Sequence, residues 1–228
     1  IDAAYKAVIL SQFGFGATID FDDVSHKGIT NISTDDVAIA QELGYVIKLV
    51  GDVREVESGI SAEVSPTFLP KNHPLASVND VMNAVFVESI GIGESMYYGP
   101  GAGQKPTATS VLADIIRIAR RLSDGNVGKP FNEFHRDLPL ANPADVKSNY
   151  YFALDTPDEK GKILHLSEIF NSEDISFEQV LQQKANGTTA RIVVITHAMS
   201  KTQLKAVTEK LEAAEDFTVV NTLKVLSN

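Results

Sequence analysis

The chain has 228 residues, of which 43% are hydrophobic and 22% charged, enough for one large domain or two smaller ones. Its formal net charge of −10 argues against a nucleic acid or an anionic membrane as the main partner, because either would repel this surface. The absence of cysteine excludes disulfides and cysteine-ligated zinc, and no run is apolar enough to span a bilayer. A cytoplasmic protein that works on small molecules is expected.

The first half of the chain predicts an α+β fold. Helices are expected from about Asp2 to Phe15, after the capping sequence Ser33-Thr-Asp-Asp36, and after Pro106. A sheet covered by helices on one face is the simplest packing for this pattern. Its strands, rich in β-branched and aromatic residues, are expected at Tyr45 to Val53, Ile60 to Leu69, Asn83 to Ser89 and Gly93 to Tyr98.

Three glycines lie in the short run Gly99-Pro100-Gly101-Ala102-Gly103, directly before the predicted helix at Pro106. Glycine lets the backbone approach a ligand closely, and a helix N-terminus adds free N–H groups and the positive end of a dipole. The run therefore predicts half of a binding site for phosphate or carboxylate. An ordinary turn from strand to helix is the alternative.

Residues 123–147 are rich in turn-forming residues, which predicts a linker whose Phe131, Phe134 and Leu138 lie against a domain surface. The following residues 148–228 predict the order βαββαβ. A strand at Tyr150 to Leu154 leads to a helix, and Asn186-Gly187 indicates a hairpin between two further strands. A helix opened by the capping box Ser200-Lys-Thr-Gln203 and a last strand complete this ferredoxin-like unit.

Few single residues indicate chemistry by themselves. Asp2 and Lys6 are four residues apart and so share one helix face, as an exposed salt bridge or as a proton-transfer pair facing a cleft. None of the five histidines has the spacing of a metal site, so no metal is expected. The chain begins at Ile1 without a capping segment, which predicts that it is the back part of a longer protein.

Several motifs, taken in order, closely resemble the catalytic domain of homoserine dehydrogenase over residues 1–122. They are Asp2-Ala-Ala-Tyr-Lys6, Asp22-Asp23-Val24 with Gly28-Ile29, Glu42-Leu-Gly-Tyr45-Val-Ile-Lys48, Pro66-Thr with His73-Pro-Leu-Ala76, and Tyr98-Gly-Pro-Gly-Ala-Gly103 with Pro106-Thr-Ala108. Residues 148–228 resemble the ACT regulatory domain that many members of that family carry. The implied organisation is a catalytic and dimerisation domain, a linker at 123–147 and an ACT domain, with the N-terminal nucleotide-binding domain missing.

This resemblance implies NAD(P)-dependent interconversion of L-homoserine and L-aspartate 4-semialdehyde, on the route to threonine, methionine and isoleucine. It makes Lys6 the acid/base for the substrate, Asp2 a substrate contact and Gly103 a residue of the dinucleotide site. Gln104 and Lys105 follow Gly103 where many members have another glycine. A homo-oligomer, dimer or tetramer, is implied, and the fragment alone should be inactive.

The ACT resemblance implies an amino-acid effector, expected to be threonine, at Gly161, Lys162 and Ile163. Lys160 replaces the usual proline before the glycine. Three alternatives stay open: a non-catalytic amino-acid-binding or dimerising module, an ACT unit that only dimerises, and a related dehydrogenase of another small amino-acid aldehyde.

Overall fold

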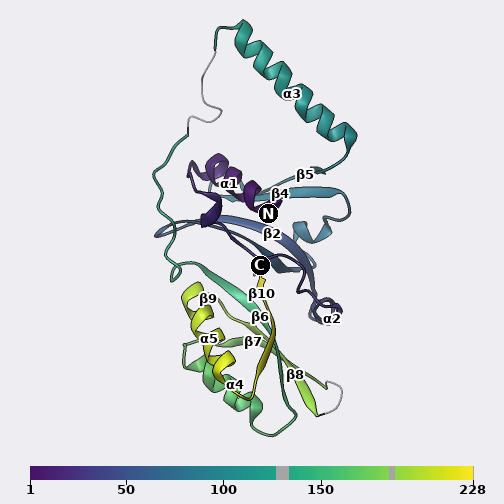
Figure 1. Ribbon diagram of the computed structural model, residues 1–228, viewed down its shortest axis with the longest axis vertical. Helices are drawn as coiled ribbons and strands as arrows, with labels where there is room; N and C mark the ends of the chain where they lie inside the picture. Colours follow the sequence, from purple (N-terminus) through teal and green to yellow (C-terminus); the bar gives the residue numbers. More distant parts are fainter. Residues whose placement is uncertain (127–133, 185–187, 228) are drawn as a thin grey trace. The chain divides into compact units, whose positions relative to one another are not determined.

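The computed structural model describes residues 1–126, 134–184 and 188–227, which group into two compact units (Figure 1). One unit combines Ile1–Pro70 with Phe134–Asn228, and the other is Lys71–Glu133. Within the first unit, residues from both ends of the chain share one sheet. The division into 1–122, 123–147 and 148–228 follows sequence pattern and stays a prediction.

The N-terminal part of the larger unit is a long antiparallel strand pair with two helices. Strands β2 and β3 pair over their whole length, with Tyr45 opposite Pro70 and Val56 opposite Gly59. The short β1 adds a parallel pairing to β3 that was not predicted. The elements are α1 (Asp2–Phe15), the 3-10 helix η1 (Phe21–Asp23), β1 (Ser25–His26), α2 (Thr34–Glu42), β2 (Tyr45–Val56) and β3 (Gly59–Pro70).

Both helices of this part pack against alternate residues of β3, as expected for a sheet covered on one face. Ala4 and Ala7 of α1 share a buried cluster with Val64 of β3, and Ile39 of α2 shares another with Phe68. Side chains two apart on a strand point to the same face, so the odd-numbered residues of β3 face away from these helices. The capping box predicted at Ser33 is present, because the Ser33 hydroxyl accepts the Asp36 N–H at 3.1 Å.

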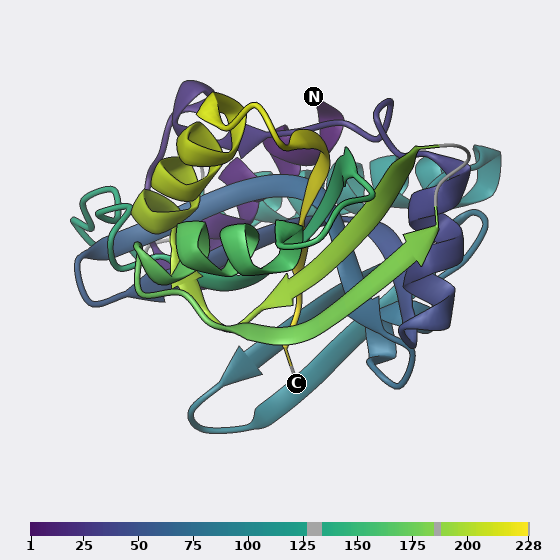
Figure 2. The same ribbon diagram turned by 90° about the horizontal axis from the view of Figure 1, so that it is seen from below.

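The C-terminal part has the predicted order βαββαβ, and its strands form the sheet order β10-β6-β8-β7. Helices α4 and α5 lie side by side against these strands (Figures 1 and 2) and bury Leu166 and Val207. The predicted turn at Asn186-Gly187 lies outside the described residues. The elements are β6 (Lys147–Pro157), α4 (Lys162–Asn171), β7 (Phe177–Lys184), β8 (Thr189–Thr196), β9 (Met199–Ser200), α5 (Lys201–Ala213) and β10 (Thr218–Val225).

The two parts of the larger unit join edge to edge. The end of β10 pairs in parallel with β3, with Lys224 opposite Thr67 and Val225 opposite Phe68. Sequence pattern predicted two separate sheets and not this pairing. The result is one eight-stranded mixed sheet that runs from β1 to β7.

Part of the predicted linker is ordered against this sheet. The Ile60 N–H donates to the Pro139 carbonyl at 2.9 Å, and Leu138 packs against the cluster under α1. Phe134 lies against Gly16, as predicted for an apolar residue of this segment, whereas Phe131 is outside the described residues. Gly59 permits the approach, because a Cβ there would lie 2.0 Å from the Pro139 oxygen.

The smaller unit consists of a two-stranded sheet and a long helix. The strands predicted at Asn83 to Ser89 and Gly93 to Tyr98 pair with each other and do not join the sheet of β2 and β3, so the prediction of one sheet for the first half of the chain is wrong. Its elements are the 3-10 helix η2 (Pro74–Ser77), β4 (Met82–Ser89), β5 (Gly93–Pro100) and α3 (Gln104–Ser123). The helix begins two residues before Pro106, so this proline occupies the first turn, where its missing N–H costs no hydrogen bond. No side chain of α3 is buried.

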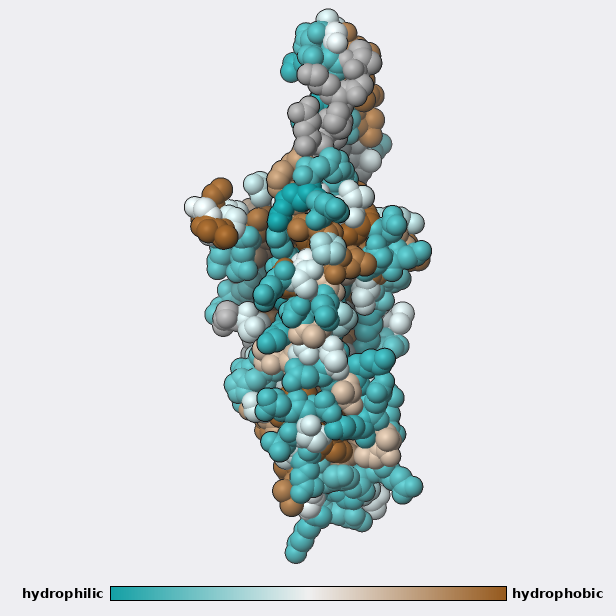
Figure 3. All heavy atoms as spheres, turned by 90° about the vertical axis from the view of Figure 1, so that its left-hand side faces the viewer, coloured by the Kyte–Doolittle hydropathy of each residue, from teal (hydrophilic) through white to brown (hydrophobic). Residues whose placement is uncertain are grey.

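Hydrophobic residues outside α3 are also exposed, and Figure 3 shows exposed hydrophobic residues on one face of the molecule. Among the described helices, none is both long and apolar enough to cross a membrane.

Candidate functional site

The first candidate site is the exposed face of α1. The helix is anchored by Ala4 and Ala7, which are buried against β2 and β3. On its outer face the Lys6 Nζ lies 2.8 Å from an Asp2 carboxylate oxygen, and the two side chains are 58% and 85% exposed. The structure therefore brings together the two residues that the sequence placed on one face.

The charge pair on α1 lies beside an exposed apolar stripe. Ile1, Tyr5, Ile9 and Phe13 follow at intervals of four residues, and each is more than half exposed. Tyr5 stacks on Phe21 of η1, with ring centroids 4.5 Å apart. Hydrogen bonding to Lys6 lowers the pKa of the Asp2 carboxyl, which keeps it ionised. A carboxylate and an ammonium on an open, partly apolar face can bind a small zwitterion.

Gly103 is the second candidate, and it belongs to the smaller unit. It is the residue before α3, with φ of 122°, a backbone conformation that favours glycine. No side chain caps the helix, no acidic residue lies in its first turn, and a Cβ at Gly103 would meet only the Pro106 ring, at 3.5 Å. The free N–H groups of a helix start and the glycine backbone fit a phosphate group.

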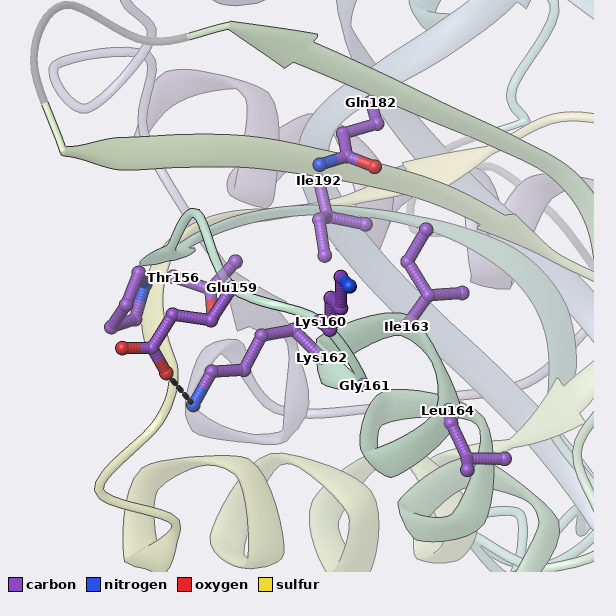
Figure 4. Close-up of a pocket in the computed structure, with 10 residues that line it drawn as sticks. Thr156, Glu159, Lys160, Gly161, Lys162, Ile163, Leu164, Gln182 and Ile192 are labelled. Carbon is purple, nitrogen blue, oxygen red and sulfur yellow. Dashed lines mark ion pairs between the residues drawn. The ribbon is translucent and has the colours of Figure 1, made fainter.

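The third candidate is a pocket of about 320 Å³ between the end of β6 and the start of α4 (Figure 4). Gly161 takes a left-handed conformation at the helix start, and no side chain caps the first N–H groups of α4. Glu159, Lys160 and Ile163 line the pocket together with Gln182 and Ile192 of the sheet. It therefore offers charged and apolar walls to one small ligand. The predicted effector residues Gly161, Lys162 and Ile163 all line it.

Lys162 is held at this pocket by a residue that sequence reasoning missed. Its Nζ lies 2.7 Å from Asp216 and 3.3 Å from Glu159, and the other Asp216 oxygen is 2.9 Å from His165 Nδ1. These contacts raise the pKa of Lys162 and lower that of Asp216. Asp216 lies 54 residues from Lys162, so no local spacing could have found it.

A second group that the sequence did not indicate is a cluster of charges on the face of β2 and β3 opposite α1. It contains two carboxylates and three cations: Asp52, Glu63, Arg54, Lys201 and Lys224. Burial alone would raise the pKa of Glu63, but Lys224 and Lys201 outweigh that effect and lower it to about 2. Within the described residues, no group of three acidic or histidine side chains is arranged to hold a metal.

Comparison with known proteins gives matches to dehydrogenases, a class of oxidoreductase. A family model described as homoserine dehydrogenase matches residues 1–116. Homoserine dehydrogenases of Lactococcus lactis and Bacillus subtilis are 59% and 35% identical to the chain over 228 and 217 residues. These matches cover 100% and 94% of this chain and 53% and 50% of the relatives.

Solved structures agree. A homoserine dehydrogenase from Thiobacillus denitrificans has a TM-score of 0.90 at 31% identity, covering 99% of this chain and 53% of that one. A homoserine dehydrogenase from S. aureus at pH 6.5 has a TM-score of 0.70 at 27% identity, covering 100% and 53%. The chain belongs to the homoserine dehydrogenase family. It spans about half the length of the curated relatives it matches.

Proposed function

We propose that the protein containing this chain interconverts L-homoserine and L-aspartate 4-semialdehyde with NAD(P), and that Lys6 moves the proton. The observation that carries the proposal is the Asp2–Lys6 pair at 2.8 Å on the open face of α1, in a chain of this family. Oxidation of an alcohol to an aldehyde releases one proton for each hydride removed. A neutral lysine amine beside the reacting oxygen can take that proton in one direction, and the ammonium that results can return it in the other.

Asp2 has a complementary role in this proposal. Its pKa is lowered, so it carries a negative charge that can hold the Lys6 ammonium in place or bind the ammonium of an amino-acid substrate. The rigid attachment of α1 supports both functions, because Ala4 and Ala7 bring the helix backbone close to β2 and β3. Binding and proton transfer then occur on one helix turn.

The cofactor is proposed to contact the backbone at Gly103. The nicotinamide supplies the hydride chemistry, and the protein supplies binding and orientation. The uncapped start of α3 and the absence of a Cβ at Gly103 suit a diphosphate group there. Gln104 and Lys105 complete the first turn, and Lys105 adds a positive charge.

The pocket at Gly161, Lys162 and Ile163 is proposed to be an amino-acid effector site of an ACT domain, with threonine as the effector. The N–H groups at the start of α4 and the Lys162 ammonium suit a carboxylate, and Ile163 suits a small side chain. A cytoplasmic homo-oligomer completes the proposal. The rival is a module that binds amino acids without catalysis, and the same pocket would serve it.

Replacement of Lys6 by alanine in the complete enzyme tests the catalytic role. We expect kcat to fall by about 10²- to 10⁴-fold, because the proton acceptor is lost, with an unchanged melting temperature, since this side chain is exposed. Turnover of homoserine and the melting temperature are measured together.

The matched control is Lys205→Ala, which likewise removes an exposed lysine, here on α5. This variant should keep normal turnover. Near-normal kcat in Lys6→Ala would contradict the role of Lys6. Absence of any homoserine turnover in the unmodified complete protein would favour the rival.

A further inference from the structure

Asp52 of β2 and Glu63 of β3 lie directly opposite each other across the antiparallel pair. Two carboxylates in this position repel each other and weaken the pairing of the strands. Lys224 of β10 forms ion pairs with both, and its side chain is only 6% exposed. This ammonium therefore offsets the repulsion within the β2–β3 pair together with Arg54 of β2, and it is the more buried of the two cations.

The same segment of the strand pair supports α1 on its other face. The residues on either side of Glu63 are Ala62 and Val64, and both pack in the cluster that contains Ala4 and Ala7 of α1. Beside Asp52, Val53 packs against that cluster. A change in the spacing of β2 and β3 at Asp52 and Glu63 is therefore a change in the surface under α1.

Two further cations contact the carboxylates, Lys201 from another element and Arg54 from β2 itself. Lys201, the first residue of α5, lies 2.7 Å from Glu63. Arg54 lies 2.8 Å from Asp52 and donates to the Lys147 carbonyl at the start of β6. Both side chains are more exposed than that of Lys224. Lys224 is therefore the cation of the cluster whose ion pairs are least weakened by water and salt.

The strand that carries Lys224 begins close to Lys162, a residue that lines the pocket. Asp216, which holds Lys162 and His165, comes two residues before the first residue of β10. Lys224 is the seventh residue of that strand, about 20 Å further along at the usual rise of a strand. One strand, with a register shift between Val219 and Asn221, thus runs from the ion pair at Lys162 to the carboxylates on the face of β2 and β3 opposite α1.

We propose that Lys224 is a coupling residue, through which displacement of β10 at the pocket changes the β2–β3 surface that carries α1. The inference that this coupling regulates activity rests on the proposed effector and catalytic roles. The structural link between β10 and α1 does not depend on those roles. A shift of β10 moves the ammonium away from two opposed carboxylates. The strand pair loosens, and α1, with Asp2 and Lys6, loses its fixed support.

Hydrogen exchange of the α1 amides in the complete protein tests whether the ion pairs of Lys224 stabilise α1. The measurement needs no ligand or substrate. Lys224→Met removes the charge and keeps the length of the side chain. We expect about tenfold faster exchange in residues 2–15, because the repulsion between Asp52 and Glu63 is released. The second change Asp52→Asn should restore slow exchange in Lys224→Met, because it removes that repulsion. Lys205→Met, an exposed lysine of α5, is the control and should leave exchange unchanged.

A second arm perturbs the pocket end of the strand. Asp216→Asn should alter exchange at α1 by about threefold or more when Lys224 is present, and not in the Lys224→Met/Asp52→Asn background. Unchanged α1 exchange in Lys224→Met, failure of Asp52→Asn to restore it, or an equal Asp216→Asn effect in both backgrounds would each overturn the coupling. If Lys224→Met alone does not fold, the doubly changed protein carries the test through the second arm. The exchange measurements need neither homoserine nor threonine. A protein that lacks turnover or threonine binding therefore does not change the exchange results, and a failure of the proposed function is distinguishable from a failure of the coupling.

Discussion

Glu63 shows how one buried charge depends on partners that are distant in sequence. Its side chain is 11% exposed, and it is paired with Lys224 and Lys201, which lie more than 130 residues later. Without them, burial would favour the neutral acid. With them, the pKa falls to about 2, so the carboxylate stays charged in the folded protein at any ordinary pH.

This depressed pKa predicts an acid-sensitive contribution to stability. The folded pKa lies below that of an unfolded glutamate, so the contribution is complete above about pH 4.5 and is lost as the pH falls towards 2. The linkage amounts to about 3 kcal/mol for this shift. Urea unfolding of the wild type and Glu63→Gln between pH 7 and pH 3 measures it.

The difference in unfolding free energy between the two proteins should be largest at pH 7 and should shrink on acidification. Glu209→Gln, which replaces a carboxylate that is 64% exposed on α5, should show almost no difference at any pH. A Glu63→Gln effect that does not change with pH would contradict the assignment.

At the scale of elements, the close approach of residues 134–147 to β3 depends on Gly59. This residue has φ of 143°, and a Cβ there would lie 2.0 Å from the Pro139 oxygen. The neighbouring Ile60 N–H donates to that same oxygen. Only glycine combines this backbone angle with this contact.

Gly59→Ala should therefore destabilise the protein by about 2 to 4 kcal/mol and expose the segment that follows Phe134 to proteolysis. Gly91→Ala is the matched control, since Gly91 lies in the turn between β4 and β5 and a Cβ there would meet nothing within 4 Å. Thermal unfolding and limited trypsin digestion at Arg136 give the two measurements. Equal stability of the two variants would mean that residues 134–147 do not depend on this contact.

At the scale of the whole molecule, the pocket beside Lys162 is a place where ligand binding would stabilise the fold. A ligand that binds only the folded state raises the melting temperature, by a few degrees at about 100 times its dissociation constant. L-threonine is expected to do this in the complete protein. Lys162→Met should reduce the shift, because the ammonium that faces the carboxylate is lost.

Lys210→Met provides the comparison, because Lys210 pairs with Glu173 and does not line the pocket. Its threonine-dependent shift should equal that of the wild type. If threonine gives no shift and no binding heat, the effector proposal is wrong, whereas the dehydrogenase proposal stands on Lys6.

The sequence by itself determined the elements and the family. The β-branched and aromatic residues of β2 and β3, the capping boxes at Ser33 and Ser200, and the βαββαβ order depend on residues that lie close together in the chain. Local backbone preferences and short-range hydrogen bonds produce these features, so a reader of the sequence can find them. The spacing of four residues placed Asp2 and Lys6 on one face of α1, and their roles stay proposals.

Only the tertiary structure decided what joins the two ends of the chain. The pairing of β10 with β3, the hold of Asp216 on Lys162, and the contact of Lys224 with Glu63 each link residues more than 50 positions apart. Such contacts depend on which strand edges pair and which charges are buried together. The spacing of hydrophobic residues along the sequence does not predict either. No local pattern marked the five charged residues of the cluster, and the fold brings them together where β3 and β10 meet, with Glu63 and Lys224 buried.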